Sequence, residues 1–429
     1  MLNIPDSQYE RIVIIGAGFA GLNIAKKLAR KNFQVVLIDK NNYHQFQPLL
    51  YQVAMAGLEP SSIIFPIRKL FQKNKNVHIR VTEVESVSHE DKRIQTSLGE
   101  IYYDKLVIAT GATTNFFGNK TFEEMTYGMK SLSESLTIRN AILGDLELAL
   151  TEPNYDERQG YIDIVIVGGG ATGVELAGAL AEMKKYILPK DYPELNEKEV
   201  DIYLFQGGQS LLMGMSEKAQ KEALRFLEKL DVKVKLGVRV TDYDGHYVYT
   251  KCNQKIQANK VIWAAGITGN LIDGLAENLE LARGNRYKVN ETHQIEGMQD
   301  VFALGDIAYM VTDKYPKGHP QVAQVAIQQA KNLAKNLIKN QSEKFKYKDL
   351  GSMATIGRNK AVADLPRIKL SGRFAWILWL FVHLISLVGF KNKVFVLINW
   401  MWNYLTYDQS LRVIVKSDPK KVLRESPKT

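Results

Sequence analysis

A strand–turn–helix pattern with three spaced glycines constrains the fold of this chain more than any other feature. In residues 11–40, "RIVIIGAGFAGLNIAKKLARKNFQVVLIDK", a β-branched run leads into Gly16, Gly18 and Gly21, and a second apolar run ends at Asp39. Glycines at G-x-G-x-x-G spacing allow a tight turn, close approach to a pyrophosphate and packing of helix on strand. The helix N-terminus offers N–H groups to the phosphates, and Asp39 is placed to accept from a ribose hydroxyl. The pattern predicts dinucleotide binding.

The same pattern occurs a second time in residues 161–183, "YIDIVIVGGGATGVELAGALAEM", with glycines at Gly168, Gly170 and Gly173. Two copies predict an α/β chain with two doubly wound Rossmann-like domains that each bind one dinucleotide. A chain of this kind usually passes electrons from a visiting nicotinamide to a flavin that stays bound. Because the motif cradles a pyrophosphate, which FMN lacks, we expect the flavin to be FAD.

Three further segments resemble parts of two-dinucleotide flavoproteins. Residues 102–118, "YYDKLVIATGATTNFFG", and residues 258–270, "ANKVIWAAGITGN", each run from an apolar strand into a small-residue turn. They resemble the segments by which each nucleotide domain returns to its cofactor. "DVFALGDIA" resembles the segment whose aspartate, here Asp306, binds the ribityl chain of the flavin. Without that resemblance, Asp306 is only a carboxylate at a strand end, and a solvated turn is the alternative.

With these motifs, the chain resembles the type II NADH dehydrogenases, which are single-subunit NADH:quinone oxidoreductases that do not pump protons. The resemblance runs from residue 12 to about residue 407. It includes residues 42–68, "NYHQFQPLLYQVAMAGLEPSSIIFPIR", residues 320–330, "PQVAQVAIQQA", and the aromatic C-terminal region. It implies hydride transfer from NADH or NADPH to FAD and reduction of a membrane quinone to quinol.

The resemblance also implies which residues form the sites. The residues expected at FAD are Gly16, Gly18, Gly21, Asp39, Thr110, Gly111, Asp306, Ala323 and Gln324. The residues expected at NAD(P)H are Gly168, Gly170, Gly173, Glu175, Gln206, Ala265 and Gly266. Catalytic roles are expected for Glu175, Gln324 and Gln328, and the quinone side is expected to include Gln324 and His383. No metal is expected.

Gln324 and Gln328 lie four residues apart and therefore share one helical face. The resemblance places Gln324 at the quinone-side edge of the flavin, where an amide can donate to a quinone carbonyl without adding charge. The alternative is a helix N-terminus with solvated glutamines. Glu175 follows the second glycine turn, near the start of a helix, where the helix dipole stabilises a carboxylate whatever its function. The more specific hypothesis is that it holds the nicotinamide amide or relays a proton for quinol formation.

Gln206 departs from the pattern of an NADH-specific domain. It ends the strand "VDIYLFQ", where an acidic residue would accept from the ribose 2′-hydroxyl and repel a 2′-phosphate. Glutamine keeps a hydrogen bond and removes the repulsion. We therefore expect NADPH to be tolerated beside NADH, although the sequence points to no arginine that would bind the extra phosphate.

The C-terminal region is expected to contact a membrane. The apolar run in residues 374–390 is shorter than the roughly 20 residues of a spanning helix, and "KNK" separates it from a second apolar run. Tryptophan, tyrosine, lysine and arginine gather here, which is the composition of a bilayer interface. We expect an amphipathic helix pair lying in that interface. The alternatives are a buried helix pair that closes a core or a dimer, and a hairpin through the membrane. His383 either lines the quinone entry, relays protons or is an ordinary core residue.

Composition excludes several other functions. The net charge of +10 favours an anionic partner, and no basic helix with base-reading neighbours indicates nucleic acid binding. Cys252 is the one cysteine, so neither a redox pair nor the cysteine pair of a sulfide:quinone oxidoreductase can form. The N-terminal residues carry no export or import pattern, so we expect a peripheral protein on the cytoplasmic face of the membrane.

The expected domains are interleaved. Residues 8–118 and 288–365 form the FAD domain, residues 119–287 form the NAD(P)H domain, and residues 366–429 form the membrane-binding segment with a basic tail. A soluble NAD(P)H oxidase, a ferredoxin-type reductase and a flavin-bearing redox-sensing membrane module stay as alternatives. The sequence leaves the oligomeric state open, with a homodimer among the options.

Overall fold

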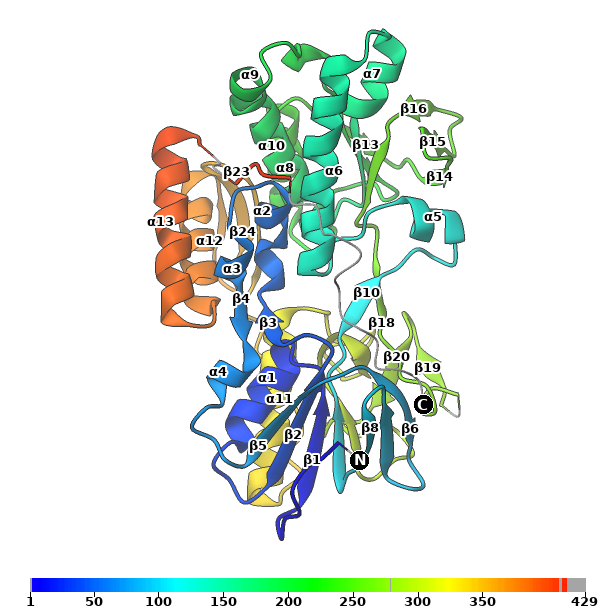
Figure 1. Cartoon of the computed structure of the whole chain (residues 1–429), viewed down its shortest axis with the longest axis vertical. Coiled ribbons are helices and arrows are strands. Elements are labelled where there is room, and N and C mark those ends of the chain that lie inside the picture. Colours follow the sequence, from blue (N-terminus) through cyan, green and yellow to red (C-terminus); the bar gives the residue numbers. More distant parts are fainter. Residues whose placement is uncertain (1, 278, 409–410, 415–429) are drawn as a thin grey trace.

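The computed structural model describes residues 2–277, 279–408 and 411–414, and two parallel β-sheets organise most of them. In order across the first sheet, the strands are β21 (Val301–Ala303), β9 (Lys105–Ile108), β1 (Arg11–Ile15), β2 (Gln34–Asp39) and β5 (Val77–Val81). In order across the second sheet, they are β13 (Val232–Leu236), β12 (Ile202–Gln206), β11 (Ile164–Val167) and β17 (Lys260–Trp263). The two units are stacked along the long axis of the molecule (Figure 1).

Each sheet is covered by helices on one face and by a small antiparallel sheet on the other. The helices of the first unit include α1 (Phe19–Leu28), α4 (Ile67–Leu70) and α11 (Ala323–Lys339). Those of the second are α6 (Leu132–Thr151), α7 (Tyr155–Ile162), α8 (Ala171–Tyr186), α9 (Leu188–Asp191) and α10 (Glu217–Glu228). The short helix α5 (Lys120–Met125) lies on the other face of the second sheet, beside its antiparallel sheet. The antiparallel sheets are β6 (Val84–Ser88), β7 (Arg93–Thr96) and β8 (Gly99–Tyr102), and β14 (Val240–Tyr243), β15 (Tyr247–Thr250) and β16 (Lys255–Gln257).

The alternation of side chains along the central strands explains this layering. In β1, Ile12 and Ile14 pack with α1 and α11, whereas Val13 and Ile15 pack with the antiparallel sheet. Both sets are buried, because a parallel strand covered on both faces is apolar throughout. β11 repeats the arrangement, with alternate side chains in contact with the helices and with β14–β16. The predicted pair of Rossmann-like α/β units is therefore present, with an antiparallel sheet in place of helices on one face of each parallel sheet.

Shorter elements join the two units. The antiparallel pair β10 (Ala112–Thr114) and β18 (Ile267–Gly269) carries the chain from one unit to the other and back. A segment between the units contains β3 (Tyr43–Gln45), η1 (Gln47–Leu49), α2 (Leu50–Ala54), α3 (Pro60–Ile63) and β4 (Ile64–Pro66). The other short elements are η2 (Glu197–Glu199), β19 (Leu281–Ala282), β20 (Arg286–Val289), η3 (Gly305–Ile307) and β22 (Ala308–Met310).

The β-hairpin that follows α11 packs against the second unit, although it was predicted to be part of the first. β23 (Ser352–Gly357) and β24 (Lys360–Asp364) pair with β25 (Lys369–Ser371), and the Ile356 carbonyl lies so close to Gly178 of α8 that a Cβ there would be 1.9 Å from it. Asp364 also accepts hydrogen bonds from Ser216, at the start of α10. These residues were expected in the FAD domain up to residue 365, but their contacts attach the hairpin to the second unit, which contains α8 and α10.

The C-terminal region contains the expected pair of helices, α12 (Arg373–Ser386) and α13 (Phe390–Thr406), which lie beside α3 and β24 (Figure 1). The break between them is residues 387–389, where Gly389 has φ +89°. The prediction that the charged "KNK" segment forms this break is wrong, because Lys391 and Lys393 lie in the first turn of α13. Within the described residues, no helix combines the length and apolarity needed to cross a membrane. Most of the expected basic tail lies outside the described residues.

Candidate active site

A cavity of about 710 Å³ lies at the carboxyl ends of β1, β2 and β9. This is the point where the strand order of the first sheet reverses, which is where doubly wound folds bind nucleotides. The volume falls within the roughly 300–1,000 Å³ typical of ligand pockets. Seven of the nine residues predicted at the flavin line this cavity: Gly16, Gly18, Asp39, Thr110, Gly111, Asp306 and Ala323.

Two of the glycines in the first turn allow close packing, and the third leaves open space. A Cβ on Gly16, which has φ +98°, would lie 2.4 Å from the Ala109 carbonyl oxygen, and one on Gly21 would lie 1.8 Å from the Gly16 oxygen. These two glycines allow β1, β9 and α1 to approach each other, which is why Gly21 supports the cavity without lining it. A Cβ on Gly18 would meet no atom within 4 Å. Gly18 therefore leaves open the space that a pyrophosphate needs, and the lining fits a dinucleotide.

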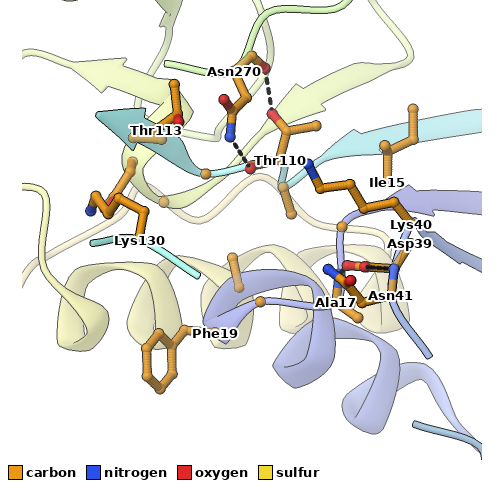
Figure 2. Close-up of a pocket in the computed structure, with 18 of the residues that line it drawn as sticks. Ile15, Ala17, Phe19, Asp39, Lys40, Asn41, Thr110, Thr113, Lys130 and Asn270 are labelled. Carbon is orange, nitrogen blue, oxygen red and sulfur yellow. Dashed lines mark hydrogen bonds between the residues drawn. The ribbon is translucent and has the colours of Figure 1, made fainter. Parts of the chain in front are cut away.

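Asp39 closes the turn from the end of β2. Its carboxylate accepts hydrogen bonds from the backbone N–H groups of Ala17 at 2.6 Å and Asn41 at 2.7 Å (Figure 2). Burial raises the pKa of Asp39, and these two hydrogen bonds with the charge of Lys40 offset part of that rise. The aspartate thus orders the glycine turn and also lines the cavity.

Asn270, Gln321 and Lys130 are among the lining residues that were not predicted from the sequence. Asn270 and Thr110 make reciprocal hydrogen bonds of 3.0 and 2.7 Å, which tie the two crossing segments together (Figure 2). Gln321 donates to the Asp306 carbonyl at 2.8 Å. Lys130 lies in the lining, and burial raises the pKa of Asp306 while the charge of Lys130 counters it. The glycine motifs carry no signal for these residues, because each comes from a distant part of the chain.

The second glycine turn repeats the geometry of the first. Gly168 has φ +120°, and a Cβ there would lie 2.3 Å from the Ala264 oxygen and 2.7 Å from the nitrogen of Ala265. Gly173 packs on Gly168 as Gly21 packs on Gly16, and Gly170, like Gly18, has open space beside it. Gly266 follows at the end of the same return segment, as Gly111 does in the first unit. The predicted nicotinamide-side glycines are thus brought together.

Gln206 occupies the place that Asp39 has in the first unit. Its side-chain oxygen accepts from the Gly169 N–H at 3.0 Å, and its Nε2 donates to the Ser210 carbonyl at 3.2 Å. The amide therefore orders the second turn without a negative charge.

Glu175 does not cap its helix; it faces a second cavity. This cavity, about 120 Å³, lies between α8, α2, β23 and the C-terminal helices, and Tyr51, Glu182 and Trp379 also line it. Burial raises the pKa of Glu175 to about 8, with partial compensation from the Thr355 N–H and the Trp379 side chain. The carboxyl group is therefore protonated in most molecules at neutral pH. Among the described residues, the Trp379 indole N–H has no hydrogen-bond partner of normal geometry.

Gln324 and Gln328 lie four residues apart on α11, as predicted, and both side chains are partly exposed, but their amides also bond to the backbone of a neighbouring segment. Gln324 donates to the Gly351 carbonyl at 2.9 Å and accepts from the Leu350 N–H at 3.1 Å. Gln328 makes the same pair of bonds with the backbone of Lys348. Both side chains hold the segment that leads into β23, and neither lines the larger cavity, to which α11 contributes Ala323 and Ala326.

His383 packs on the inner side of the C-terminal helices. Its ring stacks on Trp379 at 4.0 Å and meets Phe46 edge-on at 6.2 Å, and Phe46 in turn contacts Phe19, which lines the larger cavity. Burial lowers the pKa of His383 to about 4. Because its Nδ1 lies 2.8 Å from the Trp379 carbonyl, which can only accept, Nδ1 carries the proton of the neutral ring. A row of aromatic rings thus joins the larger cavity to α12.

The C-terminal helices expose a wide apolar face. On α12 it consists of Phe374, Ile377, Phe381 and Ile385, and on α13 of Phe390, Phe395, Leu397, Ile398, Met401, Trp402 and Leu405. We call these residues the apolar face. The tryptophans depart from the composition argument, because Trp376, Trp379 and Trp400 line the smaller cavity and only Trp402 belongs to the exposed face. Trp400 donates to Gln52 at 2.8 Å and Asn403 to the Gly57 carbonyl at 3.0 Å, which fastens α13 to the body of the protein.

Comparison with known proteins agrees with this layout. A family model of pyridine nucleotide-disulphide oxidoreductases matches residues 10–330, and a model of the NDH2 C-terminal domain matches residues 350–407. The type II NADH:quinone oxidoreductase Ndh of Mycobacterium tuberculosis is 35% identical over 414 residues, which cover 92% of this chain and 88% of that protein.

Solved structures share the fold. The structure of NDH2 from Plasmodium falciparum in complex with NADH is similar with a TM-score of 0.87 at 23% identity, covering 95% of this chain and all of that one. The sulfide:quinone oxidoreductase of Aquifex aeolicus is similar with a TM-score of 0.72 at 19% identity, covering 94% and 96%.

Proposed function

The chain belongs to the type II NADH:quinone oxidoreductases, and from that premise we propose how its own residues carry out the reaction at a membrane surface. Either NADH or NADPH binds at the second glycine turn and delivers reducing equivalents there. A quinone receives them below the C-terminal helices. FAD, when bound in the larger cavity, supplies the carrier that links a two-electron donor to the quinone.

The residues of the larger cavity bind and orient this cofactor. Gly18 and the N-terminus of α1 receive the pyrophosphate, and Asp39 accepts from the ribose next to it. Lys130 places a positive charge on the opposite side of the cavity from the glycine turn. Asp306 accepts from the ribityl chain. These roles rest on the lining and on the glycine geometry described above.

The second turn binds the nicotinamide nucleotide. Gly168, Gly170 and Gly173 form its cradle, and Ala265 with Gly266 closes it. Gln206 presents a neutral amide where a carboxylate would repel a 2′-phosphate, so NADPH is accepted beside NADH.

The observation that carries the quinone-side proposal is a buried carboxyl group, that of Glu175, which lines a cavity. Quinol formation needs two protons, and Glu175 holds one at neutral pH because burial raises its pKa to about 8. The aromatic row through Phe46 and His383 excludes water from the path between the cavity and α12. The second N–H on Nε2 of Gln324, which the Gly351 carbonyl leaves free, donates to a quinone carbonyl.

The apolar face docks the enzyme on the bilayer, at the cytoplasmic surface of the membrane. Monomeric soluble proteins seldom expose a continuous apolar patch made of so many large side chains. The spacing of the patch along α12, with residues 374, 377, 381 and 385 on one side, is that of a helix lying flat in an interface. A lipid-soluble quinone would then reach the smaller cavity from the membrane.

The test of the proton role is Glu175→Gln, with Glu217→Gln on α10 as a matched control because 88% of the Glu217 side chain is exposed. Anaerobic stopped-flow measurement separates the two half-reactions. We expect flavin reduction by NADH to change less than about twofold and reoxidation by a short-chain quinone to slow by about 100-fold, as for loss of a general acid. If instead flavin reduction slows and quinone reduction does not, Glu175 holds the nicotinamide and the proton role is wrong.

A further inference from the structure

The two nucleotide units correspond residue by residue beyond their glycine turns. Asp39 pairs with Val81 of β5, and the next backbone N–H, that of Thr82, donates to the Asp39 carbonyl at 3.0 Å. In the second unit, Gln206 pairs with Leu236 of β13, and the Val238 N–H donates to the Gln206 carbonyl at 3.2 Å. Thr82 and Val238 therefore occupy equivalent positions, although one more residue, a glycine, intervenes in the second unit.

The residue after each of these positions is also matched by its backbone contacts. The Glu83 carbonyl accepts from the Ser97 N–H at 3.1 Å, and the Arg239 carbonyl accepts from the Lys251 N–H at 2.9 Å. The strand register then shifts at Val84 and at Val240, the next residues. Arg239 is thus the counterpart of Glu83, and Glu83 lines the larger cavity beside Asp39.

The charges at these matched positions are reversed. The first unit has the acidic residues Asp39 and Glu83 at the ribose end of its site, whereas the second has neutral Gln206 and basic Arg239. The Arg239 side chain lies across the end of β12, because a Cβ built on Gly207 would be 3.2 Å from Arg239 Cγ and 3.7 Å from its Nε. Within the described residues, its guanidinium group has no hydrogen-bond or ion-pair partner.

We propose that Arg239 is the residue that binds the 2′-phosphate of NADPH. The proposal rests on the function proposed above. There, Gln206 only avoids repelling the 2′-phosphate, whereas Arg239 would attract it. An exposed guanidinium beside the strand end that receives the adenosine ribose can offer two parallel N–H donors to a phosphate. A nucleotide without the 2′-phosphate makes no such contact, so Arg239 affects NADPH and leaves NADH nearly unaffected.

The experiment compares the wild type with Arg239→Gln, with Arg239→Lys as the conservative variant and Lys221→Gln as a charge-matched control. Lys221 lies on α10 of the same unit, and 81% of its side chain is exposed. For Arg239→Gln we expect kcat/KM with NADPH to fall about tenfold or more, the usual scale for a lost hydrogen bond to a charged group, and kcat/KM with NADH to change less than twofold. Arg239→Lys should retain part of the NADPH activity, and Lys221→Gln should match the wild type.

Competitive inhibition gives a second readout that does not need turnover of NADPH. Adenosine 2′,5′-bisphosphate and adenosine 5′-monophosphate are compared as inhibitors of NADH oxidation. We expect the bisphosphate to bind more tightly than the monophosphate in the wild type and to lose that advantage in Arg239→Gln. An unchanged preference in Arg239→Gln, or no preference in the wild type, overturns the role of Arg239. Failure of the proposed function is a different result, because the wild type would then not oxidise NADH with quinone.

Discussion

The apolar face can be tested by removing its three most exposed side chains. Phe374, Phe390 and Leu405 are 76%, 82% and 76% exposed, so their packing within the protein is slight. The variant Phe374→Ser, Phe390→Ser and Leu405→Ser therefore removes contacts with the surroundings while leaving the folded chain nearly unchanged. Trp379 and Trp400, which hold the helices to the body, stay in place.

The expected effect follows from the area that each side chain can bury in lipid. Full burial of a phenylalanine or leucine side chain is worth about 1.5–3 kcal/mol. With about three quarters of each side chain available, the three together contribute about 4 kcal/mol to membrane partitioning, or about a thousandfold in the partition constant. Flavin content and the rate of flavin reduction by NADH should not change, since none of the three lines a cavity.

The assay is sedimentation with liposomes of mixed neutral and anionic lipid over a range of lipid concentrations. The control variant replaces three exposed apolar residues far from α12 and α13, namely Leu98, Leu148 and Tyr155, which are 60%, 50% and 53% exposed. Equal membrane binding by the wild type and the apolar-face variant would refute the docking argument. If the variant instead changed from dimer to monomer on gel filtration, with membrane binding intact, the face would be a subunit interface.

Three further predictions concern the cofactor cradle, the nucleotide preference and stability in acid. Gly18→Ala should reduce FAD affinity by tenfold or more, because a methyl group enters the cradle at a cost of about 1–3 kcal/mol. The control is Gly144→Ala, whose Cβ also meets no atom within 4 Å, and this variant should retain full FAD on the purified protein. Gln206→Glu should lower kcat/KM with NADPH and spare that with NADH; a strong NADH preference in the wild type that the substitution leaves unchanged would contradict the role of Gln206. Burial lowers the pKa of His44 and His293 to about 4, below the 6.5 of a histidine in the unfolded chain. Each histidine therefore leaves the free energy of unfolding unchanged above about pH 6.5 and lowers it by about 2 kcal/mol at pH 5, because the unfolded chain then binds more protons. Thermal unfolding from pH 7 to pH 5 should show this loss, with a shallower slope for His293→Gln, and an unchanged slope would refute it.

The sequence predicted the parts of the site that depend on local spacing. Strand β1, helix α1 and strand β2 follow from apolar periodicity, and the glycines between them follow from a backbone requirement that only glycine meets. The place of Asp39 and Gln206 follows in the same way, because each ends the strand beside its glycine turn and accepts a hydrogen bond from that turn. The second unit was predictable for the same reason, since it repeats the first.

The sequence could not predict contacts between distant segments. Asn270 reaches Thr110 only because β10 and β18 pair. Nothing in the sequence indicated that the Gly351 carbonyl, in the segment before β23, accepts one of the two N–H groups of the Gln324 amide. Composition placed the tryptophans at a bilayer surface, although three of the four on these helices face inward, since indole rings pack well against Tyr51 and one another. Glu175 gained its chemistry from burial under helices two hundred residues further along the chain.

The most direct test of the account is sequential anaerobic mixing of the purified full-length protein with its two substrates. The account predicts that NADH bleaches the yellow flavin absorbance, and that a quinone added next restores it within one turnover without oxygen. A colourless protein, absorbance that NADH leaves unchanged, or reduced flavin that only oxygen reoxidises would contradict it.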